Sequence, residues 1–237
     1  MISKEVVNAL KLVATEERRK VNEWFFKTGK GEYGYGDIFL GVTVPELRRI
    51  AKKFSQEISL HELTELIRSP IHEVRLCALI ILVNKYNKEE PDRIYHYYLK
   101  HLNSVNNWDL VDTSAPHIVG DYLYNNPEKS KILLEFSHSE NIWVRRISIV
   151  STFTFIRNNE FNKTLEIAKL LFNDEHDLIH KAVGWMLREV YKRDQDLIRT
   201  FLKHNYAQLP RTTLRYAIER MDKAERLLYL KGYFAEL

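Results

Sequence analysis

The chain is poor in the residues that break regular secondary structure, with only 8 Gly and 6 Pro among 237 residues. This scarcity leaves few candidate linkers between domains and few of the turns that a many-stranded sheet needs. Disordered and collagen-like chains are excluded as well, because 45% of the residues are hydrophobic and can form a core. We therefore expect an all-helical protein whose residues 1–237 form a single domain.

The chain also has a single cysteine, Cys77, which excludes an internal disulfide and a cysteine-based metal site. Its apolar setting, LCALIILV, predicts an inert position in the core. This apolar run is far shorter than the roughly 20 residues needed to cross a bilayer. The N-terminus shows no apolar stretch typical of a signal peptide. We expect a cytoplasmic protein that does not enter the membrane.

Charge is nearly balanced, with 36 Lys and Arg against 32 Asp and Glu, a net charge of +4. This mild excess permits nucleic-acid binding without requiring it. The position of the cations therefore matters more than their number.

Apolar residues recur at spacings of three and four almost from end to end, which is typical of amphipathic helices. Alternation of period two is limited to short ambiguous stretches such as residues 38–44. The pattern predicts helices over 4–14, 16–28, 45–55, 60–68, 71–86, 91–101, 108–125, 128–137, 141–157, 161–172, 177–192, 195–204, 211–221 and 223–231.

Five of these segments are similar to one another and recur every 33 to 37 residues. They are EVRLCALIIL from Glu73, LVDTSAPHIV from Leu110, VRRISIVSTF from Val144, HKAVGWMLRE from His180 and LRYAIERM from Leu214. Helical pairs repeated at this period indicate an α-solenoid of the HEAT or armadillo kind. A small residue at one aligned position, such as Gly184, predicts close packing of the next helix.

One aligned position of this repeat carries a charge in every copy: Arg75, Asp112, Arg145, Lys181 and Arg215. A curved stack would thus present a basic concave face, suited to a polyanion, with one carboxylate in it. The alternative is that these cations make structural salt bridges between repeats. The register alone does not decide between the two.

Two familiar patterns lack the context that their chemistry requires. Gly29 to Gly34 match the dinucleotide motif GxGxxG, but no strand precedes them, so we expect a loop between helices. His176 and His180 are four residues apart and could contact one metal ion, but no third ligand is evident. We expect neither a metal nor another cofactor.

The segment Asn106 to Asp112 is more informative, because Trp108 and Asp112 are four residues apart and share one face of a helix. A second indole, Trp185, directly follows Gly184 in a later repeat. For Trp143 and Trp24 we expect packing between helices.

Six collinear blocks carry a resemblance to a known family. They are GDIFLGVTVPELRRIAKKF (36–54), SPIHEVRLCALIILVNKY (69–86), NNWDLVDTSAPHIVGDYL (106–123), NIWVRRISIVSTFTFIR (141–157), HDLIHKAVGWMLREV (176–190) and PRTTLRYAIERM (210–221). In these blocks the chain resembles the AlkD-like DNA alkylation repair glycosylases, which are HEAT-like repeat proteins. It differs from that family at Asn107, where other members carry an aromatic residue.

The resemblance implies a DNA glycosylase that removes purines alkylated on a ring nitrogen, of the 3-methyladenine or 7-methylguanine type, from duplex DNA. It also implies that the damaged base stays in the duplex during catalysis. The implied catalytic residues are Asp112, Trp108 and Trp185, and the implied phosphate contact is Arg146, with Arg145 as the neighbouring candidate. Among the cations of the later repeats we expect Lys181, Arg188 and Arg215 to bind DNA too. We expect a monomer.

These residue types suit the implied chemistry. A ring-alkylated purine already carries a positive charge, so it leaves without being protonated, and one carboxylate suffices where a neutral sugar substrate needs two. Asp112 would stabilise the oxocarbenium ion and orient a water molecule. Each indole would attract the cationic nucleotide by about 1–2 kcal/mol when desolvated. Two alternatives stay open, a non-catalytic protein that binds DNA structures and a scaffold for an acidic protein partner.

Overall fold

The structure, a computed structural model, describes residues 1–86, 88 and 91–233, and these form helices and the turns between them. They divide into two compact units, Met1–Ile118 and Val119–Leu237, which are described separately here. The first unit contains α1 (Ile2–Val13), α2 (Glu16–Phe25), α3 (Val44–Phe54), α4 (Leu60–Ile67), α5 (His72–Tyr86), α6 (Pro91–Lys100) and α7 (Trp108–Ala115). The second contains α8 (Asp121–Asn125), α9 (Ile132–Ser137), α10 (Ile142–Ser151), α11 (Phe153–Arg157), α12 (Asn162–Leu170), α13 (Asp177–Tyr191), α14 (Gln195–Asn205), α15 (Arg211–Ala217) and α16 (Lys223–Lys231).

The predicted all-helical class is confirmed. Most predicted helices are found with their ends shifted by a few residues, but those over 108–125 and 141–157 are each divided in two. In the part of the chain that the structure describes, the one pairing of sheet type is an isolated parallel bridge between Ile38 and Ile71. It lies at the edge of the stretch whose periodicity was ambiguous. None of the described helices is both long and apolar enough to span a bilayer. The expectation that residues 1–237 form a single domain stays a prediction.

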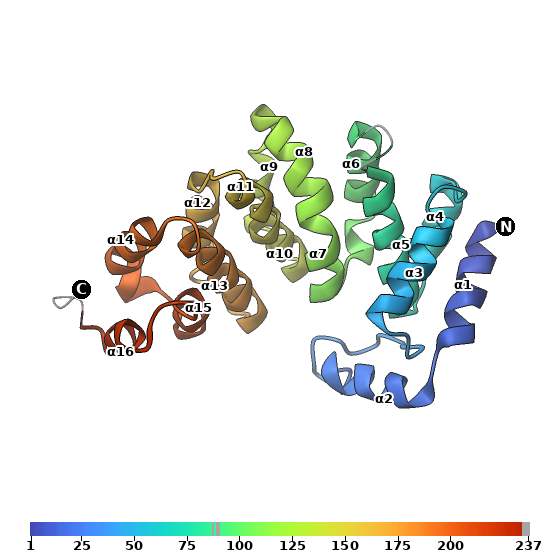
Figure 1. Ribbon diagram of the computed structural model, residues 1–237, viewed down its shortest axis with the longest axis horizontal. Coiled ribbons are helices and arrows are strands. Elements are labelled where there is room, and N and C mark those ends of the chain that lie inside the picture. The colour runs from blue at the N-terminus through green and yellow to red at the C-terminus, as the bar shows by residue number, and fades with distance from the viewer. Residues whose placement is uncertain (87, 89–90, 234–237) are drawn as a thin grey trace. The chain divides into compact units, whose positions relative to one another are not determined.

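Helix α5 is the centre of the first unit. It packs against α3, α4 and α7, and most of its side chains are buried, including Cys77. Burial raises the pKa of the Cys77 thiol to about 12, which fits the inert role predicted for it. Helix α2 runs across one end of this stack instead of along it (Figure 1). The segment from residue 26 to residue 43 leads from α2 back to α3 and passes the N-terminal end of α5, to which the bridge at Ile38 attaches it.

The second unit repeats the same plan around α13, which packs against α10, α14 and α15. The five similar segments predicted from the sequence lie on α5, α7, α10, α13 and α15. Gly184 on α13 shows why a small residue is needed at their aligned position. A Cβ atom there would lie 2.5 Å from Cβ of Tyr216 and 2.6 Å from the carbonyl oxygen of Thr213, both on α15. The predicted close approach of the next helix is therefore found in this unit.

The single helix predicted over residues 108–125 is interrupted in the structure. Helix α7 ends at Ala115 and a π-helical turn, Pro116–Gly120, precedes α8. Proline has no N–H group, so Pro116 cannot donate the regular α-helical bond to the carbonyl group of Asp112. A wider turn at this point accommodates the missing donor.

The two tryptophans that we expected in the core differ. Trp143 is buried, as predicted. For Trp24 the prediction is wrong, since 80% of the residue is exposed on α2. The sequence signal was misleading because α2 buries a single side chain, Asn22, and turns its other residues towards solvent or the segment that follows it.

We predict that Gly184→Ala destabilises the protein by about 1–3 kcal/mol, because the added methyl group overpacks the contact between α13 and α15. In an unconstrained helix a Gly→Ala substitution increases stability, so a loss of stability here would indicate overpacking. Urea unfolding measures the effect. Ser148→Ala at the aligned position of α10 is the control and should change stability by less than about 1 kcal/mol. Equal or higher stability of the Gly184 variant would contradict the close packing.

Candidate active site

Helix α7 displays Trp108 and Asp112 on one face, as the sequence predicts. The helix begins at Trp108 itself, because the side-chain oxygen of Asn107 accepts the backbone N–H of Trp108 at 2.8 Å. Asn107 is thus the N-cap residue of α7, a position at which Asn is preferred. Trp108 and Asp112 are both half-buried, one helical turn apart.

The indole of Trp108 is fixed by contacts with α2 and the segment that follows it. Its Nε1 donates to the hydroxyl oxygen of Tyr33 at 3.2 Å. One face stacks on the ring of Phe26, with 5.3 Å between ring centroids, and Phe25 contacts it edge to face at 5.8 Å. These three contacts give Trp108 a fixed orientation before any ligand binds.

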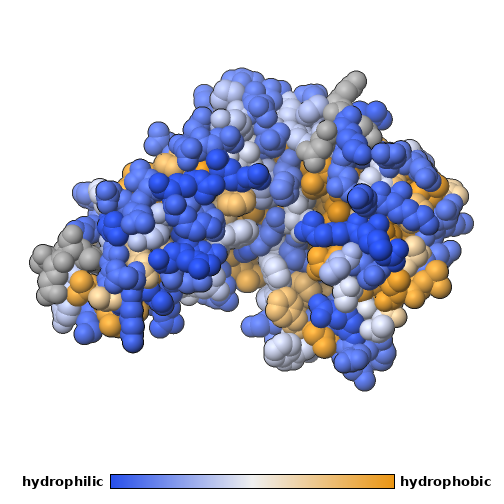
Figure 2. Space-filling view, viewed as in Figure 1, coloured by the Kyte–Doolittle hydropathy of each residue, from blue (hydrophilic) through white to orange (hydrophobic). Residues whose placement is uncertain are grey.

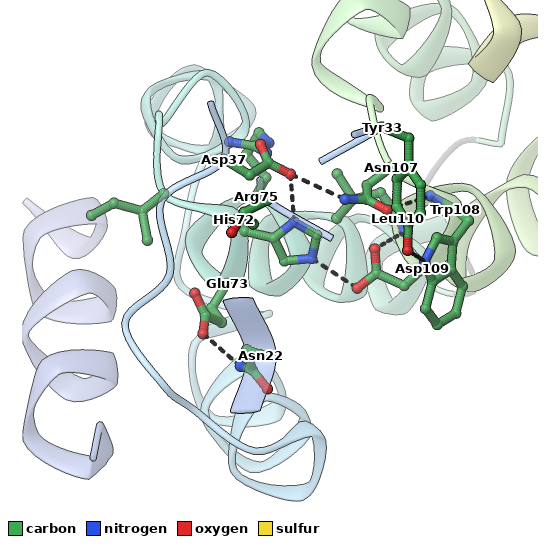
Figure 3. Close-up of polar contacts among 12 residues, drawn as sticks. Asn22, Tyr33, Asp37, His72, Glu73, Arg75, Asn107, Trp108, Asp109 and Leu110 are labelled. Carbon is green, nitrogen blue, oxygen red and sulfur yellow. Dashed lines mark hydrogen bonds and ion pairs between the residues drawn. The ribbon is translucent and has the colours of Figure 1, made fainter. Parts of the chain in front are cut away.

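Beneath the start of α7 lies a buried chain of ionisable groups, Asp37, His72 and Asp109 (Figure 3). Nε2 of His72 lies 2.8 Å from a carboxylate oxygen of Asp109, and Nδ1 lies 3.2 Å from one of Asp37. The His72 side chain is 1% exposed. A ring whose two nitrogens both face carboxylates is bound best as the imidazolium ion, which has a proton on each nitrogen.

The pKa values agree with this charge state. Burial lowers the pKa of His72, but the charge of Asp109 and the hydrogen bonds to Asp109 and Asp37 outweigh it and raise the pKa to about 9. For Asp37 burial raises the pKa, while hydrogen bonds from His72 and Asn107 and the charge of Arg75 bring it below its ordinary value. At neutral pH, therefore, His72 is an imidazolium ion and Asp37 is a carboxylate.

All carboxylate oxygens of this cluster are engaged. Asp37 accepts from Arg75 at 2.6 Å and from Asn107 at 3.1 Å in addition to His72. The second oxygen of Asp109 accepts the backbone N–H of Leu110 at 2.8 Å. The cluster thus ties the 26–43 segment, α5 and the first turn of α7 together.

A second buried carboxylate, Glu73, holds α2 in the same way. It accepts the side-chain amide of Asn22 at 3.0 Å. Its two oxygens also accept the backbone N–H groups of residues 40, 41 and 42 at 2.9 to 3.3 Å. With four donors, the Glu73 carboxylate serves as an anchor for this part of the chain.

The remaining residues expected at the site lie in the second unit. Trp185 on α13 is half-buried and its ring lies 6.0 Å from that of Phe153. Arg146 on α10 is 5% exposed and donates to the carbonyl oxygen of Leu178 at 2.7 Å. Its guanidinium group is therefore held against the first turn of α13.

The other expected DNA-binding cations mostly have acidic partners. Arg145 binds Asp174 at 2.6 Å, Lys181 binds Asp177 at 2.8 Å, and Arg188 pairs with Glu219. In the first unit Arg75 is buried against Asp37. Salt bridges to another part of the chain therefore describe two of the four aligned cations, Arg75 and Arg145, whereas Lys181 pairs within its own helix. Arg215 differs, since it is exposed and makes no ion pair within the described residues.

Sequence reasoning missed Asp37, His72 and Tyr33. The two partners of His72 are 35 and 37 residues away from it in the sequence. A faint signal was present, since Asp37 and His72 both belong to the blocks that carry the family resemblance. Among the described residues, no three His, Cys, Asp or Glu side chains are grouped as a metal site.

We predict that stability contributed by His72 disappears at high pH. Because its pKa is raised from 6.5 to about 9, this contribution is complete below pH 6.5 and is lost as the pH rises through about 9. The loss should be on the order of 3 kcal/mol. Urea unfolding of the wild type and of His72→Gln at pH 6 and pH 10 measures it. The two proteins should differ strongly at pH 6 and little at pH 10, so a constant difference would contradict the ionised cluster.

Three solved structures share the fold at low sequence identity. A predicted DNA alkylation repair enzyme from Enterococcus faecalis has 18% identity and a TM-score of 0.68, over 89% of this chain and 97% of its own. AlkD2 from Streptococcus mutans has 16% identity and a TM-score of 0.57, over 87% and 99%. The protein smu.31 from Streptococcus mutans UA159 has 16% identity and a TM-score of 0.55, over 94% and 100%.

No curated protein matches the chain in sequence. A family model does match, with the description DNA alkylation repair enzyme, and the match extends over residues 6–221. The matched range covers both units except residues 1–5 and 222–237. It includes α7 and the cluster of Asp37, His72 and Asp109 beneath it. The chain therefore belongs to the family of DNA alkylation repair enzymes.

Proposed function

We propose that this protein is a DNA glycosylase that hydrolyses the N-glycosidic bond of cationic, ring-alkylated purines in duplex DNA. The observation that carries the proposal is the pairing of Trp108 and Asp112 on one face of α7, a helix whose first turn is fixed by buried ionic contacts. The family match supports a role in DNA alkylation repair, and the substrate and the reaction are inferred from the site.

In this mechanism Asp112 acts as the only carboxylate. As the bond between the sugar and the purine breaks, its electron pair moves to the purine and neutralises the positive charge of that ring. The oxocarbenium ion left on the sugar is stabilised by the negative charge of Asp112. Asp112 also orients the water molecule that adds to the sugar and accepts its proton.

The neighbouring acids in the first unit support a mechanism without a general acid. Asp37, Glu73 and Asp109 each accept hydrogen bonds on both carboxylate oxygens, so all three are engaged within the protein and are not positioned to act on a leaving group. The reaction therefore depends on a leaving group that is already cationic. The indole of Trp108, held by Tyr33, attracts that charge through its ring face.

Trp185 and the cations of the second unit complete the proposal. Trp185 would contribute a second indole to the cationic nucleotide. Arg146, Arg145, Lys181, Arg188 and Arg215 would contact the DNA backbone, and among them Arg215 is the exposed cation without an acidic partner in the described residues. Contacts to phosphate position the duplex and do not read its sequence.

We predict that Asp112→Asn retains the fold and duplex binding but lowers excision of 7-methylguanine on the order of 100-fold or more, because it removes the charge and keeps the shape. Release of the free base from methylated duplex DNA measures activity, and a DNA titration measures binding. Asp196→Asn, which removes a 95% exposed carboxylate on α14, is the control and should remain active. Near-normal release by the Asp112 variant would contradict its catalytic role. Release by neither the variant nor the wild type would favour a non-catalytic protein that binds DNA structures.

We further predict that neutral lesions are poor substrates, since a neutral purine leaves with difficulty unless it is protonated. Single-turnover rates for 7-methylguanine and hypoxanthine in otherwise identical duplexes should differ greatly in favour of 7-methylguanine. Comparable rates would reveal a proton donor and overturn the mechanism with one carboxylate.

A further inference from the structure

A cavity of about 200 Å³ lies in the first unit beside the proposed catalytic helix. Four helices contribute one face each: α2 and α3 at the opening, α5 and α7 at the inner end. Its walls are mainly apolar, and Phe26, Leu47, Leu76 and Ile80 are buried side chains of this lining. Phe25 and Val44 also line it but are about half exposed, so the cavity opens between α2 and α3. Hydrophobic surface is visible in this region (Figure 2).

Two arginines line the cavity, Arg18 from α2 and Arg48 from α3. Within the described residues neither makes an ion pair, and Nε of Arg18 is inaccessible to solvent and has no hydrogen-bond acceptor. A shielded donor without an acceptor is uncommon in folded proteins, because it loses its bonds to water and gains none in return. An anionic ligand group at the cavity would supply the acceptor.

The adjacent arginine on each helix shows that arginines on this surface do not generally lack an acidic partner. Arg19 binds Glu16 and Glu23, and Arg49 binds Glu46, all on their own helices. Neither Arg19 nor Arg49 lines the cavity. In both helices, therefore, the arginine that faces the cavity is the one without an acidic partner.

The composition of the cavity indicates its ligand. Aromatic and aliphatic walls with Trp108, Phe25 and Phe26 suit a flat ring system, and the two guanidinium groups suit phosphate. The volume is below that of pockets for drug-sized ligands, so it suits one ring system inside and its phosphates at the opening. Glu73, Asp109 and His72 also line the cavity, but their polar atoms are engaged within the protein. The two guanidinium groups are therefore the charges left to contact a ligand, and they favour an uncharged ring over a cationic purine.

We propose that this cavity holds an unstacked, uncharged nucleobase of the bound DNA, with Arg18 and Arg48 contacting the phosphates beside it. The inference rests on the DNA binding in the proposed function and extends it to a second nucleotide, distinct from the damaged one. Excision creates such a base, because the partner of the removed purine is left unpaired opposite the abasic sugar. Bases that leave the stack are commonly enclosed between aromatic and apolar side chains.

The test uses a short duplex with 2-aminopurine opposite a tetrahydrofuran abasic analogue. The wild type should bind this duplex at least tenfold more tightly than the fully paired one, and bound 2-aminopurine should be shielded severalfold from quenching by acrylamide. The double variant R18A/R48A should lose both effects. The double variant R19A/R49A is the matched control and should keep both. Val44→Trp, which narrows the opening, should abolish shielding while it leaves binding of the paired duplex unchanged.

Equal affinity of the wild type for the two duplexes, or 2-aminopurine that stays open to acrylamide, would overturn the proposal. Equal losses in R18A/R48A and R19A/R49A would also overturn it, since they would indicate a general charge effect. The duplex contains no excisable base, so the outcome does not depend on catalysis. Excision of 7-methylguanine, measured in parallel, shows separately whether the proposed glycosylase activity holds.

Discussion

The imidazolium of His72, held between the carboxylates of Asp37 and Asp109, is the interaction on which the first unit depends. It joins three parts of the chain that local sequence does not connect: the segment after α2, the start of α5 and the start of α7. Such a buried cluster is stable only when each charge is matched and each hydrogen bond is made. Arg75 donates to the other oxygen of Asp37, and Asn107 donates to the oxygen that His72 also contacts.

Carboxylates have two different roles in the first unit. Asp37, Glu73 and Asp109 are fully bonded and serve as anchors for helix ends and for the 26–43 segment. Asp112 stands one turn further along α7 and is half-buried beside Trp108 on the displayed face. A helix fixed at its first turn keeps the carboxylate and the indole in one orientation, so a proposed catalytic group is in place before DNA binds.

The cavity beside α7 differs from the cluster around His72, because its two arginines make no ion pair within the described residues. Most cations along the repeats have acidic partners, and this makes the unpaired Arg18 and Arg48 informative. Their neighbours Arg19 and Arg49 form ion pairs on the surfaces of their own helices. In each helix, therefore, one arginine has a stabilising role and the arginine next to it has the proposed binding role.

The sequence by itself determined the helices, the repeat and the sharing of one face by Trp108 and Asp112, because all of these follow from periodicities of three to five residues or from a fixed repeat length. It also predicted the close approach at Gly184, where the small residue marks the contact. Tertiary structure alone decided which charges are partners. Residues 35 and 37 positions apart meet at His72, and local spacing contains no information about such pairs. The exposure of Trp24 also depends on tertiary structure. The sequence shows which face of a helix an aromatic residue lies on, but it does not show whether another element covers that face.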